Sequence, residues 1–260
     1  MSAQITQDQI DRHINDFASR CFRDMADRDY VAARMVCRAQ LMPQFLWSAQ
    51  QAIEKYLKYI LLVNRIKATS VRHDIQRALE LTKKASFKID LSPLSHKFID
   101  HVAAFGEYRY LDVSYAVHGY ALVDLDRAVW DLRRYCQVLD VFNKVLPERE
   151  QRMLDEAHQQ LRESKTQPPH GFRLSNGYLE RMLKNKKHPA RTALIWNNAF
   201  FGERKRKSIR ARHYLDAENA PLYLFPHMLD QILEYVFVPK ELAQAYRQHL
   251  ANIVAGRSTP

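Results

Sequence analysis

Glycine is scarce in this chain: only 6 of its 260 residues are glycine, and they are widely spaced. Sheet-rich folds need many tight turns, so this scarcity favours helices. No stretch approaches the roughly 18 uncharged apolar residues that span a bilayer. The first residues, MSAQITQDQID, lack the basic and then apolar pattern of a secretion signal. We therefore expect a mostly helical, cytoplasmic protein without a membrane segment.

Cysteine is also rare. Cys21, Cys37 and Cys136 are far apart in the sequence and lie among apolar residues. Three such residues do not build a disulfide framework or a structural zinc site, so we expect reduced thiols in the core. The chain also lacks HExxH and paired CxxC motifs, a glycine-rich phosphate loop and a GxSxG motif. We therefore expect neither a metal nor another cofactor.

Acidic residues are nearly absent from residues 165–213, which we call the basic segment. This segment holds 13 Lys and Arg but only two acids, Glu180 and Glu203. The remaining residues contain 27 basic and 27 acidic side chains, so the net charge of +11 comes from this one segment. A charge of this size in one place indicates a polyanionic partner more than a need for solubility.

Apolar residues recur at helical spacing along most of the chain. The clearest pattern begins at Pro43, which suits the first turn of a helix, and ends near Asn64. Asp29 is expected to cap the start of the second helix. Before the basic segment, helices are predicted over about 6–27, 29–37, 43–64, 74–84, 93–105, 115–142 and 147–163, with a loop at 106–114.

Two prolines and a glycine at 167–171 predict the main boundary of the chain, because they prevent a helix from continuing. The expected domains are a helical bundle over 1–165 and a basic, mostly helical region over 166–260. Residues 220–225 (APLYLF) predict a short strand or an extended segment, and two amphipathic helices follow it.

Three short motifs resemble the HEPN domain family. The helix of the first motif carries Gln51, Ala52, Glu54, Lys55, Leu57 and Lys58. His73 and Asp74 follow at the start of the next helix, where Asp74 is expected to cap backbone N–H groups. The third motif is an RYPD-like loop with Arg109, Tyr110 and Asp112, in which Leu111 replaces the proline.

The resemblance covers about residues 15–145. It implies an all-α, up-and-down helical bundle, usually a homodimer, with a role in nucleotide or RNA binding. In bacteria such proteins resemble the partners of small nucleotidyltransferases, which implies a protein partner of that class. Many members are ribonucleases that need no metal, such as toxins and defence proteins.

Many ribonucleases of the HEPN family, which this chain resembles, share an Arg-x4–6-His motif. An arginine there would bind the phosphate and a histidine would exchange protons. In this chain Arg109 and His118 occupy the expected place, but eight residues separate them and Tyr110 replaces the usual polar residue. The spacing also fits Arg152 with His158, beyond the bundle, and Arg206 with His213, in the basic segment. We therefore expect binding rather than efficient catalysis.

Aromatic residues lie among the cations of the basic segment. Cations attract phosphates and aromatic rings can stack on unpaired bases, so this composition suits the binding of single-stranded nucleic acid. These aromatics are Phe172, Tyr178, Trp196, Phe200 and Phe201, although Trp47, Trp130 and Trp196 are expected chiefly to pack against other helices. Two alternatives stay open: a ribonuclease using Arg109 and His118, and a regulatory protein that docks an acidic partner. The predicted contacts to phosphate or nucleic acid are Arg109, Lys186, Lys187, Arg204, Lys205, Arg206, Lys207, Arg210 and Arg212.

Overall fold

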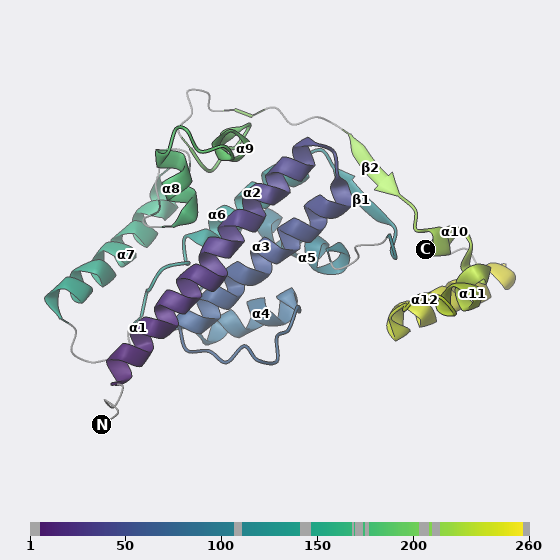
Figure 1. Cartoon of the computed structure of the whole chain (residues 1–260), viewed down its shortest axis with the longest axis horizontal. Helices are drawn as coiled ribbons and strands as arrows, with labels where there is room; N and C mark the ends of the chain where they lie inside the picture. Colours follow the sequence, from purple (N-terminus) through teal and green to yellow (C-terminus); the bar gives the residue numbers. More distant parts are fainter. Residues whose placement is uncertain are drawn as a thin grey trace.

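The computed structural model describes residues 6–106, 111–140, 147–167, 169, 174, 177–202, 208–209 and 214–256. The chain is 66% helical, and its described residues add only one small two-stranded sheet, as Figure 1 shows. The predicted all-α class is therefore confirmed. The helices before the sheet's first strand are α1 (Gln7–Phe17), α2 (Asp24–Arg38), α3 (Met42–Val63), α4 (Ile75–Leu81) and α5 (Pro93–Phe105).

A short strand follows α5, and further helices and a second strand come after it. The chain continues through β1 (Tyr115–His118), α6 (Ala121–Arg133), α7 (Glu148–Thr166), α8 (Tyr178–Lys184), α9 (Arg191–Ile195) and β2 (Leu215–Glu218). It ends with α10 (Pro221–Leu224), a 3-10 turn at Pro226–Met228, α11 (Leu229–Leu233) and α12 (Lys240–Val254). We call residues 214–256 the C-terminal arm; it extends from one end of the bundle in Figure 1.

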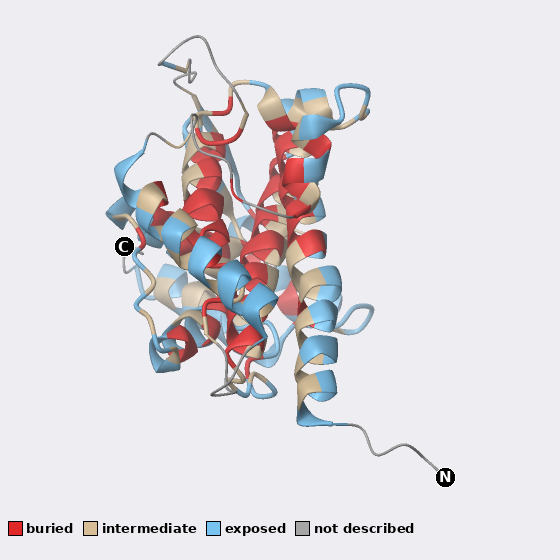
Figure 2. Ribbon diagram, turned by 90° about the vertical axis from the view of Figure 1, so that its left-hand side faces the viewer, coloured by how far each residue is buried: buried red, intermediate tan, exposed pale blue. Residues whose placement is uncertain are grey.

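Helix α3 forms the centre of the bundle, as its long apolar pattern predicts. Pro43 lies in its first turn, and Ala49, Ile53 and Leu57 are fully buried. Helices α2, α5 and α6 pack around it. Figure 2 shows buried residues gathered between the helices of the bundle and exposed residues on its outer surface. This arrangement buries one apolar face per helix and accounts for most of the stability of the bundle.

The predicted break near Asp29 is wrong. Helix α1, a π-helical turn at Ala18–Arg23 and α2 follow one another directly, so the chain stays helical from Gln7 to Arg38. The carboxylate of Asp29 does not cap a helix; it lies 2.6 Å from the Nζ atom of Lys55 on α3. Aspartate favours caps only where its side chain has no better partner, and here tertiary packing supplies one.

The predicted helix at 115–142 is also wrong at both ends. Residues 115–118 form β1, which pairs antiparallel with β2 so that Tyr115 lies opposite Glu218 and His118 opposite Leu215. Helix α6 ends at Arg133, although Tyr135, Cys136 and Leu139 beyond it are still buried. The apolar spacing after Arg133 therefore reflects burial in the core and not a helical backbone.

The predicted extended segment at 220–225 is helical instead. Pro221 begins the short helix α10, because its fixed φ angle suits a first helical turn. The strand lies a few residues earlier, in β2, where the sequence LDAE has no strong strand pattern. Its backbone partner β1 is about 100 residues away in the sequence, so local analysis did not reveal it.

One large hydrophobic core joins residues from both sides of the predicted boundary at 165/166. Leu179, Met182, Leu194 and Phe201 belong to the same core as the buried residues of α2, α3 and α6. A second, small cluster lies within the C-terminal arm and consists of Ala220, Leu229, Val238, Ala243 and Tyr246. The boundary itself stays a prediction, although α8 and α9 pack on the bundle.

Candidate nucleic-acid interface

A buried arginine on α2 holds the chain segment that follows α9. The carboxylate of Asp126, on α6, accepts hydrogen bonds from Arg34 and from the hydroxyl of Tyr30, the latter at 2.7 Å. Arg34 also donates from Nε to the carbonyl oxygen of Ala193 at 3.0 Å and from Nη2 to that of Trp196. Arg34 and Asp126 are both buried, so this pairing fixes the backbone at Trp196 against two helices of the bundle.

Asn198 holds the same segment from the other side. Its amide nitrogen donates to the Tyr30 hydroxyl at 2.8 Å and to the Leu194 carbonyl at 2.9 Å. Its carbonyl oxygen accepts from the backbone N–H groups of Phe200 and Phe201 at 2.8 and 2.9 Å. All four hydrogen-bonding positions of this fully buried amide are thus used, which makes the turn after Trp196 rigid.

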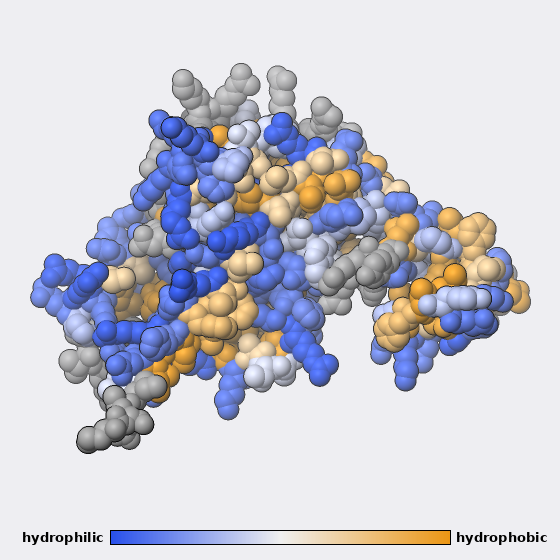
Figure 3. Space-filling model, in the orientation of Figure 1, coloured by the Kyte–Doolittle hydropathy of each residue, from blue (hydrophilic) through white to orange (hydrophobic). Residues whose placement is uncertain are grey.

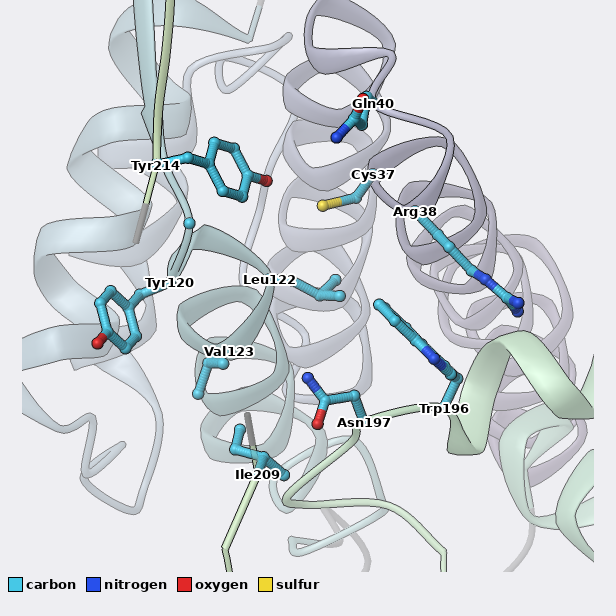
Figure 4. A pocket seen from close by; sticks show the side chains of 11 residues that line it. Cys37, Arg38, Gln40, Tyr120, Leu122, Val123, Trp196, Asn197, Ile209 and Tyr214 are labelled. Atoms are coloured by element: carbon cyan, nitrogen blue, oxygen red, sulfur yellow. The ribbon is translucent and has the colours of Figure 1, made fainter. Parts of the chain in front are cut away.

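A pocket of about 1060 Å³ lies against this fixed segment (Figure 4). Three parts of the chain meet there: the end of α2, the start of α6, and residues that flank or interrupt the cationic run after α9. Asn197 contributes from a left-handed backbone conformation with φ of 50°, which asparagine tolerates better than most residues. The lining residues are Cys37, Arg38, Gln40, Gly119, Tyr120, Leu122, Val123, Trp196, Asn197, Ile209 and Tyr214.

The wall of the pocket combines an aromatic face with a cation. The guanidinium of Arg38 lies 5.2 Å from the centre of the Trp196 ring, and 41% of Trp196 is exposed. Figure 4 shows the indole beside the Arg38 side chain, with Asn197 on its other side. An exposed indole offers a surface on which a base can stack, and an arginine can pair with phosphate oxygens. Trp196 is therefore exposed at the pocket wall and not buried between helices, as a pure packing role would require.

Cys37 also lines the pocket, but its chemistry is not that of a nucleophile. Burial raises the pKa of its thiol to about 11, so the thiol stays protonated at neutral pH. Cys37 and Cys136 are buried free thiols, as expected, whereas Cys21 is exposed, which corrects its predicted place in the core. The pocket is therefore suited to binding through stacking, hydrogen bonds and charge.

The predicted catalytic histidine, His118, lies on β1 and close to the pocket. Its Nδ1 atom accepts a hydrogen bond from the backbone N–H of Tyr120 at 3.2 Å. In the neutral ring the proton is therefore on Nε2, which lies 3.6 Å from the Asp124 carboxylate. Both ring nitrogens thus lie near groups of the same chain.

The surroundings of His118 perturb two further titrating groups. Burial lowers the pKa of His101, on α5, and the nearby charge of His118 lowers it further. Burial raises the pKa of Asp124, while His118 and Arg127 act in the opposite direction. The predicted companion of His118, Arg109, lies outside the described residues, so its distance from His118 stays untested.

The predicted nucleic-acid contacts fall into two groups. Lys186 and Lys187 are exposed in the turn between α8 and α9, and within the described ranges neither forms an ion pair. The rest of the predicted cations after α9 lie outside the described residues. Ile209 lies within this run and lines the pocket, so the run is continuous along the chain with the pocket wall. The cations outside the described residues are Arg204, Lys205, Arg206, Lys207, Arg210 and Arg212.

Other residues noted in the sequence have structural roles. Asp74 caps α4 by accepting from the backbone N–H of Arg77 at 2.8 Å, as predicted. Arg152 pairs with Glu148 on its own helix at 2.7 Å, while His158 bonds to the Leu139 carbonyl at 2.7 Å, so these two do not form a shared site. Arg206 and His213 lie outside the described residues.

The aromatic and cationic residues of the pocket come from distant parts of the sequence. Arg38 carries no motif, and Tyr120 and Tyr214 are separated by almost a hundred residues. The sequence pointed to Trp196 and to the neighbouring cations, but not to the residues of α2 and α6 that complete the pocket. Their place in the pocket depends on tertiary packing, which brings the end of α2 close to the start of α6.

Comparison with known proteins agrees with the resemblance. Residues 19–141 match the family model described as the HEPN domain, so the chain carries a HEPN domain over these residues. The match ends before α7, and the basic segment and the C-terminal arm lie beyond it. Neither a search of curated proteins nor one of solved structures gave a match. None of the helices in the described ranges combines the length and apolar character needed to cross a membrane.

Proposed function

We propose that this protein binds single-stranded RNA, or a nucleotide, in the pocket lined by Arg38 and Trp196. A HEPN domain is consistent with nucleotide or RNA binding and with ribonuclease-type activity. The observation that carries the proposal is the exposed Trp196 indole, held rigidly beside the Arg38 guanidinium. The cationic run after α9 adjoins this pocket along the chain and would follow the phosphates of a strand.

The chemistry of the pocket favours an unpaired strand over a duplex. Base stacking on an aromatic ring contributes about 1–3 kcal/mol per base and requires an unstacked base. Cations along the backbone add affinity by releasing counterions from the phosphates. Leu122 and Val123 supply an apolar wall for the edge of a base, and Asn197 and Gln40 supply amides for hydrogen bonds.

Binding without efficient cleavage is the preferred form of this proposal. Proton transfer from a 2′-hydroxyl requires a free ring nitrogen, and both nitrogens of His118 face partners in the chain. The ribonuclease stays the alternative, with Arg109 binding the scissile phosphate and His118 transferring the proton. A nucleotidyltransferase as protein partner is a further part of the proposal, on the resemblance to HEPN proteins alone.

Fluorescence anisotropy with a labelled single-stranded RNA, at low salt and in EDTA, tests the binding proposal. We expect Trp196→Ala and Arg38→Ala each to weaken binding about 5- to 100-fold, corresponding to about 1–3 kcal/mol. Arg152→Ala, on α7, and Tyr223→Ala, on the C-terminal arm, remove a matched exposed arginine and aromatic ring and should leave affinity unchanged. Equal affinity of all four variants would contradict the proposal.

The same samples, run on a denaturing gel, separate binding from catalysis. We expect the RNA to stay intact with the wild-type protein. Cleavage that persists in EDTA and is lost in His118→Ala would instead establish the ribonuclease. Neither binding nor cleavage at low salt would favour the third function, the docking of an acidic protein by the basic segment.

A further inference from the structure

The C-terminal arm exposes an unusual amount of apolar surface. Tyr235 is 84% exposed and Phe237 86% exposed, and both lie in the turn between α11 and α12. Figure 3 shows apolar side chains gathered over the arm. Apolar surface concentrated in this way marks an interaction site, whereas single exposed apolar residues need no explanation. Further large apolar side chains exposed on the arm are Leu224, Phe225, Met228, Val236, Ile253 and Val254.

Among the residues that the structure describes, the arm has only a small buried core of its own. Its buried cluster contains only five residues, too few to stabilise a separate unit. Its attachments include the pairing of β1 with β2, a hydrogen bond from Tyr246 to the Asp112 carbonyl, and one from the Ala220 N–H to Ser114 at 2.9 Å. A small projecting unit of this kind gains stability when a second surface covers its apolar face.

The charge of the arm identifies the kind of surface that fits it. Residues 214–256 contain five carboxylates and two basic side chains, whereas the basic segment holds 13 cations and two acids. Glu234 lies next to Tyr235, and Lys240 and Glu241 follow Phe237. The arm as a whole has three more acidic than basic side chains, so a cationic surface complements its charge.

This protein carries such a surface itself, apart from the arm. In Figure 1, α8 lies on the side of the bundle away from the arm and α9 lies nearer the middle, and the turn between them carries the exposed Lys186 and Lys187. Lys184, at the end of α8, is also exposed. The arm of one molecule therefore cannot cover its own α8 and α9. It can cover those of another molecule, and attraction between unlike ends favours this association.

We propose that the C-terminal arm docks through Tyr235 and Phe237 on the α8–α9 surface of a second copy of this chain, and that the exchange is reciprocal. A reciprocal, two-fold exchange forms two identical contacts and closes as a dimer, whereas a one-way contact would continue into an open chain. The arm lies beyond the residues that match the HEPN domain, so this interface belongs to the part of the chain outside that domain.

Analytical ultracentrifugation of the full chain tests the proposal. We expect a dimer at micromolar concentration, and the double variant Tyr235→Asp/Phe237→Asp should raise the dissociation constant at least about tenfold. Met153→Asp, on α7, changes a side chain that is 57% exposed and should leave the dimer intact. Because these side chains are exposed, circular dichroism should show that all variants are folded.

Crosslinking locates the contact. In a mixture of isotopically labelled and unlabelled copies, Lys240 of the arm should crosslink to Lys184, Lys186 or Lys187 only between copies. A monomeric wild-type chain, a dimer unaffected by the double variant, open higher oligomers, or arm crosslinks confined to other surfaces would each overturn the proposal. Loss of dimer in the double variant together with the labelled crosslinks would establish it.

Discussion

Arg133 on α6 and Asp27 on α2 form a fully buried ion pair, with Nε of Arg133 3.0 Å from Oδ1 of Asp27. Arg133 also donates to Glu180 of α8 at 2.8 Å, and the second oxygen of Asp27 accepts from the backbone N–H groups of Tyr178 and Leu179. This charged cluster attaches the start of α8 to the bundle. Its carboxylates raise the pKa of Arg133 well above its usual value despite burial, so the arginine stays charged.

Substitution of this arginine should be costly. Arg133→Ala leaves Asp27 and Glu180 buried without their cation, so we expect the free energy of unfolding to fall by about 3–5 kcal/mol. Urea denaturation measures this change, and hydrogen exchange should show faster exchange in α8. Arg152→Ala removes an exposed pair on α7 and should cost less than about 1 kcal/mol. Similar losses in the two variants would show that the buried cluster is not what attaches α8.

The cationic run after α9 should determine the salt dependence of RNA binding. Replacing Arg204, Lys205, Arg206 and Lys207 with glutamine removes four charges, and each lost contact with a single-stranded phosphate lowers the slope of log K against log salt by about 0.7. We therefore expect the slope to fall by up to about 3. The matched control removes four exposed lysines elsewhere, at Lys83, Lys84, Lys88 and Lys97, and should leave the slope unchanged. An equal fall in both variants would indicate a general charge effect.

His101 should make stability depend on pH. Burial and the charge of His118 lower its pKa in the folded protein, so below about pH 6.5 the unfolded chain binds more protons at this site. The stability that neutral His101 contributes is present above that pH and is lost as the pH falls toward the folded-state pKa. The melting temperature of the wild type should therefore fall more between about pH 7.5 and 5.5 than that of His101→Gln. Parallel melting curves would contradict a lowered pKa at His101.

Asn198 should stabilise both the fold and the pocket. Asn198→Ala leaves the buried N–H groups of Phe200 and Phe201 without acceptors, at a cost of about 1–3 kcal/mol for each. We expect lower stability in urea and weaker RNA binding, because Trp196 lies in the turn that Asn198 holds. Asn185→Ala removes an exposed turn contact to the N–H of Lys187 and should change stability by less than about 1 kcal/mol. RNA affinity that is unchanged in folded Asn198→Ala would separate this turn from the binding site.

RNA binding and the proposed dimer should compete, because both use the basic segment. Adding single-stranded RNA to the dimer is therefore expected to increase the monomer fraction in ultracentrifugation. The double variant Tyr235→Asp/Phe237→Asp should bind RNA at least as tightly as the wild type, since no partner arm covers its cations. RNA that leaves the dimer intact would mean that the two surfaces do not overlap.

The local features of this fold could be predicted from its sequence. The apolar stripe of α3 and the capping role of Asp74 depend on residues close together in the chain, and each was found where it was expected. The resemblance to the HEPN family is confirmed by the family match over residues 19–141. The position of Trp196 near a dense group of cations was also visible. Short-range spacing and side-chain chemistry determine such features, so they are present before the chain folds.

The tertiary structure decided what depends on distant partners. The pairing of β1 with β2 turned the start of a predicted helix into a strand, and the pairing of Asp29 with Lys55 removed a predicted cap. Arg34 and Asn198 placed Trp196 beside Arg38, so that a residue expected to pack became part of a pocket wall. Local sequence patterns specify most of the helices, and the composition specifies the uneven charge. Only folding determined which side chains meet, because these contacts join residues up to 168 positions apart and compete with local preference.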